Sequence, residues 1–258
     1  MVEMRIIGLD IGSRTVKRVI LEDGVPVEHR VLPGTHDPLA VCEELLAGQE
    51  ADRVAATGYG RRLFAAHREA EVITEIRAVA LGALHVHPAA RSLLDIGGQD
   101  TKVISIRPDG QVGKFEMNDR CAAGTGRFLE VMATALAYSI DEFVCAGREA
   151  ERSQAINAMC TVFAESEVIS ATARGVDRAE MARGLHEAVT RRALAMLRRI
   201  DLRDDVVFCG GGALNGCLRQ FISEGLGREV HVPPEPQILA ALGAALSAVP
   251  EAERSEVG

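Results

Sequence analysis

Short apolar runs that end at glycine turns alternate along the chain with stretches in which apolar residues recur every three or four positions. The runs are typical of buried strands and the periodic stretches of helices. We predict helices near residues 39–46, 74–85, 214–224 and 237–248, a long helical run from 124 to 202 with breaks at Gly147 and Gly175, and strands at 53–57, 112–116, 206–209 and 229–232. This order indicates an α/β protein with mixed sheets.

Two segments of the chain resemble each other. Residues 7–24, IGLDIGSRTVKRVILEDG, match residues 93–110, LLDIGGQDTKVISIRPDG. Each copy reads as an apolar strand, Asp-Ile-Gly, a polar turn, a lysine, a β-branched strand and an Asp-Gly turn. Two copies are too few for a repeat array and indicate two related subdomains. We place the first subdomain at 1–90 plus 236–258 and the second at 91–235.

Composition and charge exclude several classes of partner. The chain has 258 residues, a formal net charge of −8 and no tryptophan. These values argue against a nucleic-acid partner, because phosphate recognition needs a basic surface and base stacking needs aromatic side chains. The sequence shows no signal-peptide pattern and no run of the ~18 apolar residues that a membrane span needs. We therefore expect a cytoplasmic protein without a membrane partner, whose six cysteines stay reduced.

Each Asp-Ile-Gly turn carries residues suited to a metal-bound nucleotide. Glycines let backbone N–H groups approach phosphate oxygens, and a nearby carboxylate holds Mg²⁺ through water. One such turn is typical of an ordinary hairpin, whereas two matched copies favour a phosphate site. The candidate catalytic residues are Asp10, Asp95 and Gln99, of which the two aspartates would organise Mg²⁺. The expected phosphate contacts are Gly12, Ser13, Thr15 and Lys17 in the first copy and Gly97, Gly98, Gln99 and Asp100 in the second.

A third glycine-rich turn, CGGGALN at residues 209–215, follows an apolar strand and opens a predicted helix. A helix N-terminus suits an adenosine and its α-phosphate. Neither the Gly-x-Gly-x-x-Gly order of a dinucleotide fold nor the Gly-Lys-Ser/Thr of a P-loop is present in it. The expected adenosine contacts are Gly210, Gly211, Gly212 and Asn215. Two phosphate hairpins followed by this turn resemble the actin-like ATPases, a superfamily that includes acetate and sugar kinases, chaperone ATPases and actin, and this resemblance implies nucleotide binding without fixing a reaction.

Two cysteines lie in longer motifs. Cys121 and Cys160 precede predicted helices in the segments NDRCAAGTGRFLE and CTVFAESEVIS. A helix N-terminus favours a thiolate, although position alone is also typical of small buried residues. Both segments, together with the sequence GYGR at 58–61, resemble the BadF/BadG/BcrA/BcrD family of activator ATPases of 2-hydroxyacyl-CoA dehydratases. A cubane cluster needs four thiolates and the chain has no Cys-x-x-Cys, so two chains would contribute two thiolates each.

This resemblance implies an iron–sulfur ATPase. In that family, ATP binding and hydrolysis change the angle between two helices that meet at a [4Fe-4S] cluster, and the reduced cluster passes one electron to a dehydratase or reductase. Carried over, the resemblance implies Cys121 and Cys160 as cluster ligands, with ATP/ADP and Mg²⁺ as further cofactors. It also implies a homodimer, or a pseudo-symmetric heterodimer with a homologous subunit, that receives electrons from reduced ferredoxin or flavodoxin.

Three other functions fit parts of the sequence. The same fold serves as a permanent ATPase subunit of benzoyl-CoA reductases, which a tight hetero-oligomer would indicate. A sugar or acetate kinase would share the nucleotide turns but needs a catalytic base, for which no segment between the two hairpins is a clear candidate. An actin-like assembly ATPase would polymerise with ATP and carry no iron. The remaining cysteines, Cys42, Cys145, Cys209 and Cys217, we interpret as structural.

Overall fold

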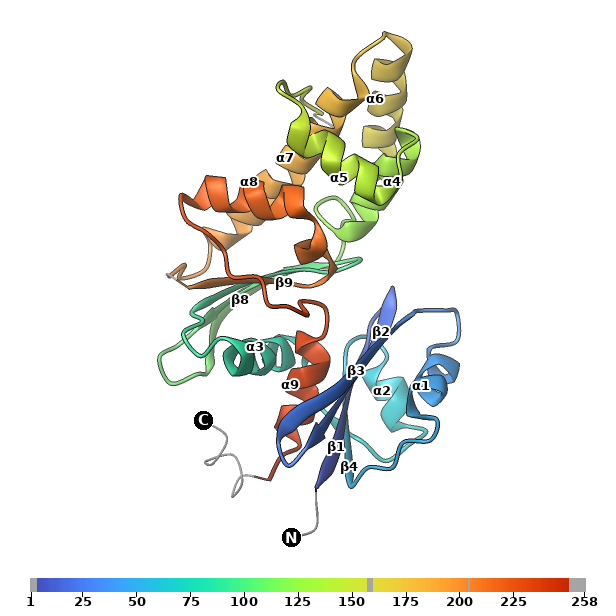
Figure 1. The fold of residues 1–258 in the computed structure, drawn as a ribbon, viewed down its shortest axis with the longest axis vertical. Helices are drawn as coiled ribbons and strands as arrows, with labels where there is room; N and C mark the ends of the chain where they lie inside the picture. Colours follow the sequence, from blue (N-terminus) through green and yellow to red (C-terminus); the bar gives the residue numbers. More distant parts are fainter. Residues whose placement is uncertain (1–3, 157–159, 204, 251–258) are drawn as a thin grey trace. The chain divides into compact units, whose positions relative to one another are not determined.

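A computed structural model describes residues 4–156, 160–203 and 205–250 (Figure 1). The chain divides into two compact units. The first comprises Met1–Ala90, Ile106–Val112 and Gln237–Gly258, and the second comprises Arg91–Ser105 and Gly113–Pro236. None of the helices in the described ranges is both long enough and apolar enough to cross a membrane.

The first unit is built on a five-stranded sheet in the order β3-β2-β1-β4-β5. Its strands are β1 (Arg5–Ile11), β2 (Thr15–Glu22), β3 (Val25–Pro33), β4 (Arg53–Thr57) and β5 (Glu71–Val72), and its helices are α1 (Pro38–Leu46), α2 (Arg61–Ala65), α3 (Glu75–Val86) and α9 (Leu239–Ser247). Strand β1 runs antiparallel to β2 and parallel to β4. The central strand is therefore hydrogen-bonded on both sides, and its residues are buried from Ile6 to Ile11.

The two faces of this sheet are covered in different ways. Ile7, Leu9 and Ile11 alternate along β1 and belong to an apolar cluster with residues of α1 and α2. Gly8, of opposite parity, faces α9, where a Cβ would lie 2.0 Å from the carbonyl oxygen of Ala241. The close approach of helix to strand thus requires a residue without a side chain. Helix α9 also packs against α3.

The second unit contains a four-stranded sheet in the order β8-β7-β6-β9. Its strands are β6 (Ser92–Ile96), β7 (Thr101–Ile106), β8 (Val112–Asn118) and β9 (Val206–Cys209), and its helices are α4 (Gly126–Ala135), α5 (Ile140–Glu149), α6 (Thr161–Ala173), α7 (Arg178–Leu197), the short 3₁₀ helix η1 (Gly211–Leu214) and α8 (Gly216–Leu226). Helix α7 packs against α5 and α8, and α4 packs against α6 (Figure 1). One apolar core joins these helices to β6, β7 and β9.

The two sheets share a topology, which extends the sequence duplication. In each, a hairpin pairs antiparallel strands, a third strand follows on the far side of the second, and a later strand pairs in parallel with the first. Strand β4 in the first unit thus corresponds to β9 in the second. The duplicated element is a four-stranded subsheet rather than a hairpin alone.

Several predicted elements need correction. In the described part of the run predicted from 124 to 202 there are four helices, and Gly147 lies inside α5 rather than at a break. The predicted strand at 229–232 is reduced to a single bridge between Val207 and His231, since Pro233 and Pro234 have no N–H to continue a ladder. Strand β3, most of whose side chains are exposed, was not predicted.

Candidate functional site

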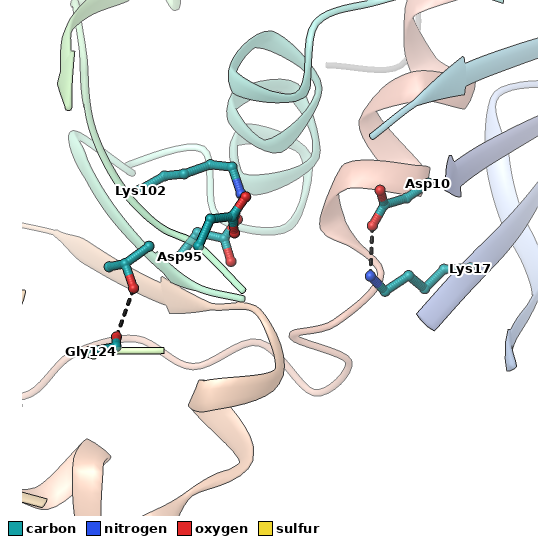
Figure 2. Close-up of polar contacts among 7 residues, drawn as sticks. Asp10, Lys17, Asp95, Lys102 and Gly124 are labelled. Atoms are coloured by element: carbon teal, nitrogen blue, oxygen red, sulfur yellow. Dashed lines mark hydrogen bonds and ion pairs between the residues drawn. The ribbon is translucent and has the colours of Figure 1, made fainter. Parts of the chain in front are cut away.

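The first hairpin presents a buried carboxylate at its turn. Asp10 is the next-to-last residue of β1 and lies directly across from Lys17 on β2. Lys17 Nζ is 2.8 Å from Asp10 Oδ2 (Figure 2). Asp10 is only 4% exposed, and among the described residues its Oδ1 has no hydrogen-bond partner. A buried carboxylate oxygen without a donor is energetically costly. It suits a site where a metal-bound water or another donor completes the shell.

The second hairpin repeats this pairing with an additional carboxylate. Asp95 and Lys102 occupy the same cross-strand register as Asp10 and Lys17. Lys102 is 1% exposed, and its Nζ lies 2.8 Å from Asp100 Oδ1 and 3.5 Å from Asp95 Oδ2. These three side chains together are net negative. The sequence analysis assigned no role to Lys102, although a lysine seven residues after the aspartate in both copies is a usable signal.

Each Asp-Ile-Gly turn is covered by a Gly-x-Gly turn from the parallel strand beside it. Gly58 follows β4 with φ of 83°, and a Cβ there would lie 2.6 Å from Asp10 Oδ1. Gly210 follows β9 with φ of 79°, and its Cβ would lie 2.2 Å from Asp95 Oδ1. The predicted adenosine turn is thus the structural counterpart of residues 58–60. The two turns hold the two aspartates in equivalent ways.

Asn215 stabilises the start of α8 with its side chain. Its Oδ1 accepts hydrogen bonds from the backbone N–H groups of Cys217 and Leu218, each at 3.0 Å. Its Nδ2 lies 3.0 Å from His186 Nε2, so the imidazole accepts there. The predicted adenosine contact therefore shapes the turn as an N-cap. The sequence analysis missed His186, which lies 29 residues away on α7.

His186 is a buried neutral imidazole. Its Nδ1–H donates to the carbonyl oxygen of Ala182 at 2.8 Å, and its ring centroid lies 4.5 Å from that of Phe143. The side chain is fully buried, and this burial lowers the pKa of His186 from 6.5 to about 4, against a smaller opposing effect of the Ala182 carbonyl. Protonation would place an N–H against the Asn215 amide and break the bond between them.

We expect the protein to lose stability as the pH falls from about 6.5 to about 4. Above this range His186 is neutral in both the folded and the unfolded chain. Below pH 6.5 His186 binds a proton in the unfolded chain but stays neutral in the folded chain, because its pKa there is lowered to about 4. The free energy of unfolding should fall by up to about 3 kcal/mol from this group. Urea unfolding across this range would measure the loss. His186→Gln should flatten the slope, whereas His36→Gln, at an exposed histidine, should leave it unchanged.

Cys121 lies in a loop that is fixed by its neighbours. Its side chain is exposed, but the carbonyl oxygens of residues 121–124 all accept hydrogen bonds from the side chains of Asn118, Thr125 and Thr101. Figure 2 shows the bond at Gly124, which Thr101 Oγ1 makes at 2.8 Å. Helix α4 follows this loop as predicted, but it begins at Gly126 rather than 124, so Cys121 lies outside the helix N-terminus.

Cys160 occupies the predicted place at a helix start. It is the N-cap of α6, its thiol is exposed, and α6 ends at Ala173, next to the predicted stop at Gly175. Burial raises the pKa of Cys42 to about 11 and that of Cys217 to about 12, and it raises the pKa of Cys209 well above its usual value. These three thiols are structural. In the described ranges, no three His, Cys, Asp or Glu side chains form a metal-binding group.

This geometry coincides with a match to a known family. A model described as the BadF/BadG/BcrA/BcrD ATPase family matches residues 7–248. The chain belongs to this family. This match confirms the family resemblance inferred from the sequence. The predicted actin-like fold is confirmed as well, because solved structures of that fold match the chain at 19% and 12% identity. At such low identity these structures bear on the fold alone.

Members of the family that resemble the chain carry specific names. The activator of lactoyl-CoA dehydratase of Anaerotignum propionicum is 40% identical over 97% of this chain and 100% of its own length. The (R)-2-hydroxyglutaryl-CoA dehydratase activating ATPase of Acidaminococcus fermentans is 38% identical, over 96% and 98%. A solved structure, the activator of the 2-hydroxyisocaproyl-CoA dehydratase from Clostridium difficile with bound ADPNP, superposes with a TM-score of 0.88 at 37% identity, covering 98% of this chain and 97% of that one.

The other predicted site residues of this family member lie at the hairpin turns. Ser13 and Gln99 are exposed there and Thr15 is partly buried. The N–H of Gly12 bonds to the Thr15 carbonyl at 3.2 Å, and that of Gly97 bonds to the Asp100 carbonyl at 2.9 Å. Further along the chain, Gly211 is exposed and Gly212 is buried against Ile96. Whether these residues contact a nucleotide stays a prediction.

Proposed function

We propose that this chain is an iron–sulfur ATPase that activates a 2-hydroxyacyl-CoA dehydratase. Two copies would share one [4Fe-4S] cluster, and ATP hydrolysis would be coupled to the transfer of one electron to the dehydratase. The observation that carries the proposal is the exposure of Cys121 and Cys160, which lie in the two segments that resemble the family's cluster-ligand motifs. The electron donor in this proposal is reduced ferredoxin or flavodoxin.

The hairpins supply complementary chemistry for Mg-ATP. Asp10 offers a buried oxygen without a donor in the described part of the chain, which fits a water of the Mg²⁺ shell. Lys17 lies beside it and would add positive charge for the phosphates. In the second hairpin, the net negative group of Asp95, Asp100 and Lys102 favours the cation side of the nucleotide.

Backbone donors would bind the phosphate oxygens. Within the described ranges, the N–H groups of Gly98 and Gln99 make no hydrogen bond to the protein. Such donors at a glycine turn are suited to anions. Asn215 would act on the adenosine side through the turn that it caps rather than by a direct bond, since its Oδ1 already accepts two hydrogen bonds.

The thiols fit a cluster that is completed by a second chain. Cys160 lies at the N-terminus of α6, whose dipole favours a bound anion, and Cys121 lies in a loop whose carbonyls are all hydrogen-bonded. A bound [4Fe-4S] cluster would supply the low-potential electron. The part of this chain is to hold two ligands, Cys121 in the loop before α4 and Cys160 at the start of α6. These two helices pack together.

Anaerobic purification tests the proposal. We expect a brown dimer with about four iron atoms per two chains, which hydrolyses ATP only with Mg²⁺. Its reduction potential should differ between ADP and a non-hydrolysable ATP analogue, because a ligand shifts a conformational equilibrium by its differential affinity. Iron-free protein, or a full cluster in a monomer, would contradict the proposal. ATP-dependent polymers without iron would favour an assembly ATPase, and a tight hetero-oligomer a reductase subunit.

A further inference from the structure

We propose that Thr101 is a positioning residue that links the nucleotide state of the second hairpin to the loop of Cys121. Thr101 is the first residue of β7, one position after Asp100, and is 3% exposed. Its hydroxyl donates to the carbonyl oxygen of Gly124 at 2.8 Å. The inference rests on the proposed function, because it assumes that the hairpin binds a nucleotide.

Two backbone hydrogen bonds run beside the threonine bond. The N–H of Gly126 donates to the carbonyl of Gly97, and the N–H of Arg127 donates to the carbonyl of Gly98, each at 2.9 Å. The first N–H groups of a helix have no partner within the helix. In α4, two of these donors are satisfied by the hairpin turn itself. Helix α4 is therefore capped by the segment that is expected to bind phosphate.

The hairpin turn thus has two functional sides. The carbonyls of Gly97 and Gly98 point toward α4, while in the described part of the protein the N–H groups of Gly98 and Gln99 have no protein partner. A peptide unit is planar, so an N–H that turns toward a phosphate rotates the carbonyl on the same unit. The unit between Gly97 and Gly98 carries both the acceptor for Gly126 and one of these donors. A phosphate bound by this N–H is therefore coupled through one rigid peptide unit to the cap of α4.

Comparison of the two hairpins singles out the threonine hydroxyl. The residue that corresponds to Thr101 in the first copy is Val16, which starts the same strand pairing opposite Ile11, as Thr101 does opposite Ile96. Valine and threonine have almost the same shape, and Val16 is fully buried. The hairpin fold therefore does not need the hydroxyl. The loop that carries Cys121 follows the second hairpin, and it is in this hairpin that the position holds a side-chain donor, Thr101, which bonds to the loop.

Thr101 bonds to the C-terminal end of the Cys121 loop, at Gly124. Gly124, whose φ is 99°, lies at the C-terminal end of the loop that carries Cys121. Asn118 holds the other end by donating to the carbonyl of Cys121 at 3.0 Å. With one end anchored on β8 and the other on the nucleotide hairpin, a shift of the hairpin changes the orientation of Cys121. Hydrogen bonds at both ends of the loop provide a contiguous route for such a shift.

The labelling rate of Cys121 tests this link without any cluster. Cluster-free full-length protein is treated with N-ethylmaleimide in the presence of Mg-ADP or of Mg²⁺ with a non-hydrolysable ATP analogue, and each cysteine is quantified by mass spectrometry. We expect the rate at Cys121 to differ by about fivefold or more between the two nucleotides. The rate at Cys145, which is exposed on α5, should be unchanged and serves as an internal reference.

Thr101→Val should reduce this ratio by at least about threefold, as expected for one lost hydrogen bond, while nucleotide affinity is retained. Thr101→Ser should restore the ratio. Thr190→Val is the matched control, because Thr190 is a buried threonine of the same unit whose hydroxyl has no partner among the described residues. Amide exchange of Gly126 and Arg127 in the unaltered protein should also depend on the nucleotide.

The outcomes separate the two proposals. If Thr101→Val keeps the full ratio, or if Thr190→Val lowers it equally, Thr101 has no specific role. If the unaltered protein binds both nucleotides but neither Cys121 labelling nor amide exchange at α4 responds, the link is refuted and nucleotide binding stands. If no nucleotide binds, the proposed function itself fails, and the inference fails with it.

Discussion

Gly210→Ala and Gly58→Ala are expected to be among the most damaging single changes in the protein. At each position a Cβ would meet a buried aspartate oxygen, at 2.2 Å from Asp95 Oδ1 and at 2.6 Å from Asp10 Oδ1, and both glycines have positive φ. Strain in the backbone and overpacking together should lower the free energy of unfolding by roughly 2–5 kcal/mol. The displaced carboxylate should also weaken Mg-ATP binding. Urea unfolding and titration calorimetry would measure the two effects.

Two other glycines separate the contribution of backbone strain from that of the clash with the aspartates. Gly48 and Gly227 also have positive φ, at 72° and 68°, but a Cβ at either would meet nothing within 4 Å. Alanine there should cost only about 1 kcal/mol, from the backbone alone, and should leave nucleotide affinity unchanged. Equal losses in all four variants would show that the clash with the aspartates is unimportant.

The second large effect concerns iron. Cys121→Ser and Cys160→Ser should each abolish cluster assembly, because each removes one ligand from both chains of the proposed dimer and leaves two thiolates where four are needed. The thiols are exposed, so the folded chain should persist with an unchanged circular dichroism spectrum. Iron analysis of anaerobically reconstituted protein would check the loss.

Cys145→Ser provides the matched control for this experiment. Cys145 is an exposed cysteine on α5 that lies outside both motif segments. This variant should retain its iron. A cluster that survives in Cys121→Ser or in Cys160→Ser would overturn the ligand assignment, and loss of iron in Cys145→Ser would show that the chain uses a different set of thiols.

The hairpins were predictable because their signals are local. Each consists of two strands joined by a short turn, so the positions of Asp10 and Lys17 in the sequence determine that they pair. The same reasoning located β4 at its observed bounds. It failed for the break between α4 and α5, because the C-cap of α4 is Leu136 and the N-cap of α5 is Ser139, and neither is a glycine.

The contacts that distinguish the site could not be read from the sequence. Thr101 and Gly124 are 23 residues apart, and His186 and Asn215 are 29 apart. No periodicity connects such pairs, because the packing of whole elements brings them together. A comparison of the duplicated segments would nevertheless have flagged Thr101, where a polar residue replaces the buried Val16 of the other copy.

The packing of α9 on β1 has a consequence for the order of folding during synthesis. Strand β1 precedes α9 by more than two hundred residues, yet Gly8 packs against Ala241 on that helix. One face of the first sheet therefore stays uncovered until α9 is made. The second unit consists of residues 91–105 and 113–236, so it can complete its core before α9 is made. Because domains fold as units when their residues are available, the first unit should finish after the second.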